Sequence, residues 1–273
     1  MKIVQAELRK LFSFREVYIA LFFCLILLSL QFYMGRTPDP NYTFWISMRN
    51  LFQGNGAWYI AVMVVVGISR ILPYERETGI DELLKTYKHG ISKILLAKLT
   101  TVFFYCLSVV TFFHIVATSI YWKIYSFEGY NMPIAEGSTY SWNGLQSVNF
   151  SHWQYLLYEY TYLIVASFSF GLCVLAISLV VKRSVWVMVI CGGLFAASEF
   201  SYHFLLKFFS TDMIGAIIAY LYRFGYNGML HMFLLDIRPL LQLSISMLAL
   251  YLFIPIVLLI GVIILAYRRK VKW

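Results

Sequence analysis

Charged residues are scarce in this chain. They make up 13% of its 273 residues, while 61% of the residues are hydrophobic and the mean hydropathy is +0.74. Soluble domains carry about 25% charged residues, so this composition excludes an ordinary soluble protein. Apolar runs of roughly 17 to 27 residues are long enough for helices to cross about 30 Å of hydrocarbon, and the two-residue alternation of a membrane β-barrel is missing. We therefore predict an all-α, multi-pass membrane protein.

Sequence motifs for catalysis are also missing. The chain contains no G-x-x-x-x-G-K-[ST] run for nucleotide phosphates, no H-E-x-x-H run for zinc and no G-x-S-x-G nucleophile motif. Its five histidines are dispersed, and its four cysteines form no C-x-x-C pair and fall inside apolar runs. We predict no enzyme activity, no metal site and no cofactor in this chain.

Six apolar runs are long enough to be membrane spans, so we predict that residues 1–273 form a single transmembrane domain. An even number of spans puts both termini on one side, and the positive-inside rule places that side in the cytosol. Sixteen of the 22 Lys and Arg residues then lie inside and six outside. These cations are scattered over short loops that face anionic lipid, so the net charge of +9 does not indicate nucleic-acid binding. The expected spans are Val17–Met34, Ala57–Leu72, Leu99–Ile120, Tyr155–Val181, Val185–Leu206 and Leu240–Tyr267.

The segments outside the spans have distinct patterns. Residues 1–15 place apolar side chains on one side of a helix and basic ones on the other, which predicts an amphipathic helix in the membrane interface. Residues 35–56 contain prolines and glycines, and residues 121–154 are rich in Tyr, Trp, Ser, Asn and Gly, so we expect external loops there. Residues 207–238 are apolar but interrupted, which predicts short re-entrant external helices before the last span.

The loop between the second and third expected spans has the pattern of a short helix over residues 77–88, which we call the docking segment. Thr78 and Asp81 have the spacing of a capping box, Asp81 and Lys85 form an i, i+4 pair, and Gly90 suits the end of a helix. Such a short helix is not stable alone, so we expect it to pack against a partner, the bilayer surface or its own bundle. Its apolar face consists of Ile80, Leu83, Leu84 and Tyr87.

This loop resembles a motif in the first cytoplasmic loop of ABC-2 type ABC-transporter permeases. The matching pattern is E-x-G-x-x-x-L-L-x-T with a downstream lysine, here Glu77, Gly79, Leu83, Leu84, Thr86 and Lys98. The chain departs from the family at Ile80, where many members have Thr, and after the helix, where it has Lys88, His89 and Gly90 instead of Pro.

The resemblance implies that the docking segment is a coupling helix, seated in a cleft of a separate ATPase subunit that binds ATP and Mg²⁺. It further implies a dimer with a second copy or a homologous permease, export of substrate, and a bacterial plasma membrane. On this basis we expect the ATPase-docking residues to be Glu77, Gly79, Asp81, Glu82, Leu83, Leu84, Lys85 and Tyr87.

Two carboxylates fall inside expected spans. Glu159 lies near the outer end of the fourth span and Glu199 lies within the fifth. A charge in the membrane core costs several kcal/mol unless it finds a partner or water. Both residues are therefore candidates for the substrate path, and the structural alternative for Glu199 is a bend where the carboxylate meets water.

Three functional classes remain open from the residues alone. The first is the membrane subunit of an ABC exporter for a hydrophobic or amphipathic substrate, such as a peptide, a lipid-linked molecule or a drug. The second is an intramembrane enzyme that acts on lipid or peptide through Glu159, Glu199 and His203. The third is an ion-coupled carrier, which would normally show inverted internal repeats.

Overall fold

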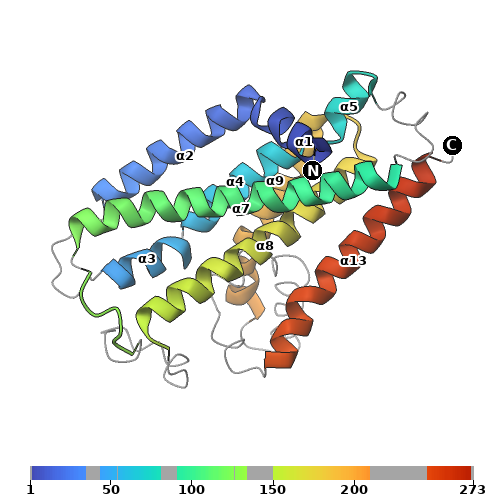
Figure 1. The fold of residues 1–273 in the computed structure, drawn as a ribbon. Coiled ribbons are helices and arrows are strands. Elements are labelled where there is room, and N and C mark those ends of the chain that lie inside the picture. Colours follow the sequence, from blue (N-terminus) through green and yellow to red (C-terminus); the bar gives the residue numbers. More distant parts are fainter. Residues whose placement is uncertain are drawn as a thin grey trace.

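The computed structural model describes residues 2–34, 44–53, 55–80, 91–125, 127–133, 150–209 and 245–271. Within these ranges it is helical apart from turns, connecting residues and an isolated bridge between Pro133 and Ser151. The long helices form a bundle, with α3 and α5 toward opposite ends (Figure 1). In chain order the helices are α1 (Lys2–Phe12), α2 (Arg15–Met34), α3 (Phe44–Gln53), α4 (Asn55–Ile68), α5 (Pro73–Glu77), α7 (Ile91–Ile124), α8 (His152–Val180), α9 (Ser184–Phe209) and α13 (Ile245–Val271).

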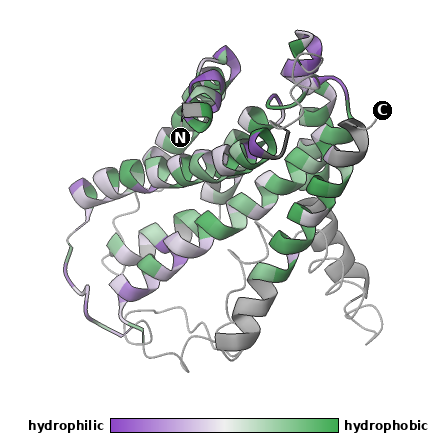
Figure 2. Cartoon of the chain, turned by 45° about the vertical axis from the view of Figure 1, so that its right-hand side comes forward, coloured by the Kyte–Doolittle hydropathy of each residue, from purple (hydrophilic) through white to green (hydrophobic). Residues whose placement is uncertain are grey.

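Four helical stretches are long and apolar enough to cross a membrane: Arg15–Tyr33, Gly56–Glu77, Lys93–Ile124 and His152–Val180. They coincide with the first four expected spans. The fifth and sixth expected spans fall on α9 and α13, whose apolar parts Ser184–Ala196 and Phe253–Tyr267 are shorter. Hydrophobic residues cover the middle of the helices and hydrophilic ones gather toward the ends (Figure 2). The all-α class is therefore confirmed, with four helices long and apolar enough to cross a membrane, while the membrane location, the count of six spans and the cytosolic side of the termini stay predictions.

The helix α4 lies at the centre of the bundle. It contacts α2, α7, α8 and α9, and α8 in turn contacts α7 and α13. By contrast, α2 exposes a row of large apolar side chains, which suits contact with lipid; the row includes Tyr18, Ile19, Phe22, Phe23, Ile26 and Leu30. The bundle thus has a buried central helix and an apolar outer surface.

The contact between α4 and α7 depends on a glycine. Gly67 faces the ring of Tyr105, which is fully buried and donates a hydrogen bond from its hydroxyl to the carbonyl of Met63 at 2.8 Å. A Cβ atom at Gly67 would lie 2.4 Å from the Tyr105 Cζ and hydroxyl oxygen, closer than any real contact. Only glycine therefore permits this approach of the two helices.

We expect Gly67→Ala to destabilise the protein. The Tyr105 ring must move and lose its hydrogen bond to Met63, and overpacking of this kind costs about 1–3 kcal/mol. Thermal unfolding in detergent, followed by the loss of the monodisperse peak, should show a lower midpoint. Gly261→Ala in α13 is the matched control, because nothing lies within 4 Å of its Cβ position. An equal midpoint for both variants would contradict this packing.

A buried helix occupies much of the segment 35–56, which we expected to be an external loop. This expectation was wrong for α3, where Phe44 and Met48 are fully buried. The indole N–H of Trp45 donates to the carbonyl of Glu128 at 3.2 Å, which ties α3 to the chain that follows α7. The prolines and the glycines lie in the flanking sequence, so they mark the limits of the helix rather than a loop throughout.

The other expected segments are described in part. The helix α1 covers most of residues 1–15 and contacts α7 and α4, with Leu11 buried between them; its interfacial location stays a prediction. Within 121–154, α7 continues to Ile124 and α8 begins at His152. The re-entrant segment 207–238 lies outside the described residues after Phe209, where α9 ends.

Candidate functional site

The short helix α5 brings three consecutive charged residues to one end of the bundle. It begins at Pro73, whose fixed φ suits the first turn of a helix, and it ends with Glu75, Arg76 and Glu77 just before the rest of the docking segment. Each of the three side chains bonds to a different part of the bundle. The helix is therefore a junction between the docking segment and the bundle.

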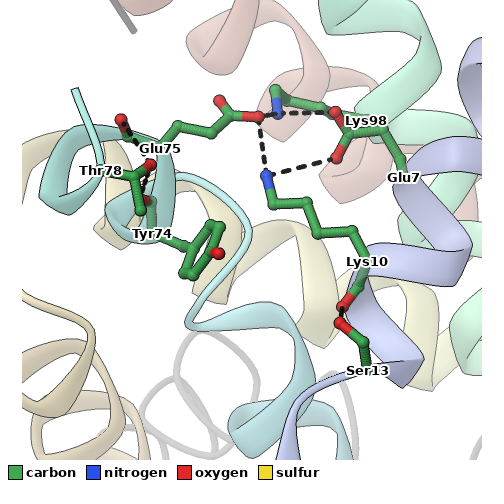
Figure 3. A network of polar contacts seen from close by, with 7 residues as sticks. All are labelled: Glu7, Lys10, Ser13, Tyr74, Glu75, Thr78 and Lys98. Carbon is green, nitrogen blue, oxygen red and sulfur yellow. Dashed lines mark hydrogen bonds and ion pairs between the residues drawn. The ribbon is translucent and has the colours of Figure 1, made fainter. Parts of the chain in front are cut away.

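Glu75 is the centre of a buried ion cluster that joins α5 to α1 and α7 (Figure 3). Its Oε1 accepts hydrogen bonds from Lys98 Nζ at 2.5 Å and from Lys10 Nζ at 2.9 Å. Glu7 completes the cluster, with Oε1 3.4 Å from Lys98 Nζ and Oε2 3.8 Å from Lys10 Nζ. Two carboxylates thus face two ammonium groups.

The cluster is balanced in charge, and this balance makes its burial tolerable. Lys98 is 0% exposed and the Glu75 side chain is 5% exposed, so both have lost their contact with water. Removing a charge from water costs several kcal/mol, which only well-placed opposite charges and hydrogen bonds offset. Lys98 can therefore be accommodated within α7 only while α1 and α5 bring their carboxylates to it.

Arg76 and Glu77 bind the turn between α8 and α9. The Arg76 guanidinium donates from Nη1 to the carbonyl of Val181 at 3.0 Å and from Nη2 to that of Leu179 at 3.1 Å. The Glu77 carboxylate accepts from the backbone N–H of Ser184 at 3.1 Å and from its hydroxyl at 3.3 Å. A cation thus meets the C-terminal end of α8 and an anion meets the N-terminal end of α9, the favourable sign at each helix end.

Thr78 does not have the role that the capping-box spacing predicted. It caps the C-terminus of α5 with φ −95° and ψ −1°, and its hydroxyl donates to the Tyr74 carbonyl at 2.7 Å. An N-cap residue has an extended backbone, so this part of the prediction was wrong. Gly79 follows with φ +72°, a conformation that favours glycine.

The remaining expected docking residues, Asp81, Glu82, Leu83, Leu84, Lys85 and Tyr87, lie outside the described residues. Glu77 and Gly79 lie directly before them, and the side chain of Ile80 is exposed. The docking role of this whole set stays a prediction.

Glu159 lies far from α5, in the half of the bundle that contains α3. It is 0% exposed on α8 and interacts electrostatically with Arg49 of α3, which is 4% exposed. Neither carboxylate oxygen accepts a hydrogen bond from the part of the chain that the structure describes. The structure therefore brings Glu159 close to a buried basic residue of the segment 35–56, which was expected to be an external loop.

A second contact between α7 and α3 is aromatic: His114 of α7 stacks on Phe52 of α3 at 3.8 Å between ring centroids.

Glu199 lies within α9, but its side chain is outside the described residues, as is that of His203. The substrate-path role of Glu159 and Glu199 stays a prediction.

Sequence reasoning missed most of the ion cluster. Lys98 was named from the resemblance alone, and the roles of Glu7, Lys10 and Glu75 were not anticipated. One signal was present: Lys98 directly precedes the expected span Leu99–Ile120, and a lysine at the start of an apolar run needs a nearby carboxylate or water. The sequence could not show which carboxylate meets it, because Glu75 and Glu7 lie 23 and 91 positions away.

Comparisons of the chain with protein-family models, curated proteins and solved structures found no match in any of the three. Among the residues described, no group of three or more His, Cys, Asp or Glu side chains could hold a metal ion, and all four cysteines are free. The charged residues of α5 bind this short helix to α1, α7, α8 and α9.

Proposed function

We propose that this chain is the membrane-spanning subunit of an ABC-2 type exporter and works with separate ATPase subunits. In this proposal six helices cross the plasma membrane, both termini are cytosolic, and a second copy or a homologous permease completes the translocation path. The substrate is hydrophobic or amphipathic, and ATP and Mg²⁺ bind to the partner chains. The chain supplies the path and the mechanical coupling.

The observation that carries the proposal is the attachment of α5. The motif that resembles the family's coupling helix begins at Glu77, and the residue two positions earlier is held in a buried ion cluster with α1 and α7. A docking element that receives force from an ATPase must be joined rigidly to the membrane helices. The balanced cluster at Glu75 supplies such a joint because breaking it would leave buried charges unpaired.

In the proposed mechanism, force passes from the docking segment through this joint to the membrane helices. Closure of the ATPase pair on ATP pushes on Leu83, Leu84 and Tyr87. The polar rim of the contact consists of Glu77, Asp81, Glu82 and Lys85. The push passes to α5, then through Glu75 to α1 and α7. Movement of these helices changes the seam between the two permease copies.

The double variant Leu83→Asp with Leu84→Asp tests the docking contact. Two carboxylates in an apolar contact remain without partners, so we expect at least a tenfold loss of captured ATPase and of ATP-linked transport. Capture from mild detergent and vesicle transport are the measurements. Lys93→Asp in the exposed first turn of α7 is the control for added negative charge near this end. Normal capture and transport by the double variant would contradict the proposal.

A further inference from the structure

Arg76 and Glu77 have a feature that the docking proposal does not use. They are adjacent on α5, yet they bind different helices: Arg76 binds the C-terminal end of α8, and Glu77 binds the N-terminal end of α9. Between these ends the chain makes only a short turn through Val181, Lys182 and Arg183. The dipeptide therefore spans the whole turn from one side.

The chemistry of each contact matches the helix end that it meets. The last carbonyl groups of a helix lack intrahelical donors, and the first N–H groups lack acceptors. Arg76 supplies two N–H donors to the carbonyls of Leu179 and Val181, and Glu77 supplies one carboxylate oxygen to the N–H and the hydroxyl of Ser184. If the two residues were exchanged, a carboxylate would meet the negative C-terminal end of α8 and a guanidinium would meet the positive N-terminal end of α9, which is unfavourable at both ends.

We propose that Arg76 and Glu77 are positioning residues that transmit movement of the docking segment to the turn between α8 and α9. This inference rests on the proposed function. Glu75 joins α5 to α1 and α7, whereas Arg76 and Glu77 join it to α8 and α9. Four helices that contact α4, namely α1, α7, α8 and α9, are thereby linked to one short helix, so a push on α5 displaces the start of α9 together with α7.

Glu77 has a different role as a positioning residue than as part of the docking contact. As a rim residue of the docking contact, Glu77 would bind the ATPase through its charge. As a positioning residue, it binds Ser184 within the chain, and Gly79 at φ +72° lies between it and the remainder of the docking segment. The two roles predict different losses when the side chain is changed.

The test compares Glu77→Ala, which removes the acceptor, with Glu77→Gln, whose amide oxygen can still accept from the Ser184 N–H. In the purified full chain, we expect amide exchange at residues 184–187 to be at least tenfold faster in Glu77→Ala. With the ATPase present, we expect capture within twofold of the wild type and transport at most one tenth of it. Glu77→Gln should recover at least half of the transport. Arg183→Gln, an exposed charge in the same turn, should match the wild type.

Each other outcome has a definite meaning. Wild-type transport by Glu77→Ala overturns the transmission role, and equal loss of ATPase capture in Glu77→Ala and Glu77→Gln returns Glu77 to the docking contact. If the wild-type chain captures no ATPase, the proposed function fails and the transmission role fails with it. The amide-exchange rates at residues 184–187 still decide whether Glu77 binds Ser184 in the purified chain. Should Glu77→Ala not fold, Arg76→Ala, which removes both donors, and Arg76→Gln, which keeps an amide donor, provide the same comparison at the α8 end.

Discussion

Glu75→Leu is expected to lower the free energy of unfolding by about 3–5 kcal/mol. The change removes the carboxylate that accepts from both Lys98 and Lys10 and leaves two buried or partly buried ammonium groups facing the single carboxylate of Glu7. At roughly 2 °C per kcal/mol for a large domain, the midpoint of thermal unfolding in detergent should fall by roughly 6–10 °C.

Two further variants decide whether charge balance is the cause. Glu75→Leu combined with Lys98→Met replaces an opposite-charge pair with two apolar side chains, which in buried sites is often neutral or stabilising. We expect the double variant to lie within about 1 kcal/mol of the wild type. Glu16→Gln is the control for an exposed ion pair, because Glu16 pairs with Arg70 and its side chain is 45% exposed. This change should cost at most about 1 kcal/mol. A double variant as unstable as Glu75→Leu would contradict the balance argument.

Arg49→Met is expected to have the second large effect on stability. It leaves the carboxylate of Glu159, which is 0% exposed, without its nearby cation. Loss of this electrostatic interaction, which includes no hydrogen bond from the described residues to either Glu159 oxygen, should cost about 0.5–3 kcal/mol, and it should also loosen α3 from α8. The measurement is again thermal unfolding in detergent, together with protease cleavage within α3.

The control for this prediction is the double variant Arg49→Met with Glu159→Gln. It removes both charges and keeps the length of the Glu159 side chain, so at least half of the lost stability should return. If Arg49→Met alone unfolds at the wild-type temperature, then Arg49 does not stabilise Glu159.

The helical membrane class could be predicted because it depends on local properties. Apolar runs of about 17 to 27 residues identify spanning helices whatever their neighbours, and four of the runs became helices of sufficient length in the structure. The helix within the segment 35–56 was harder to predict, because the ten residues of α3 give only a short helical pattern next to Pro38 and Pro40, which are typical of loops.

The contacts around α5 could be predicted only in part. The motif from Glu77 onward was visible in the sequence, but hydrogen bonds between Lys98 and Glu75, or between Glu77 and Ser184, join residues that are distant along the chain. Thr78 shows the limit of spacing rules. Its separation from Asp81 suits a capping box, yet Thr78 is the C-cap of α5, and its hydroxyl donates to the carbonyl of Tyr74 in that helix. Tertiary context decided which helix the threonine caps.

Whether this chain works with a separate ATPase can be decided by capture of the tagged wild-type chain from its native membrane in mild detergent. We expect an ATPase with a G-x-x-x-x-G-K-[ST] motif to elute with it in about equal amount, and we expect the complex to hydrolyse ATP. A wild-type chain that elutes without such a protein, yet transports substrate when reconstituted alone, would contradict the account.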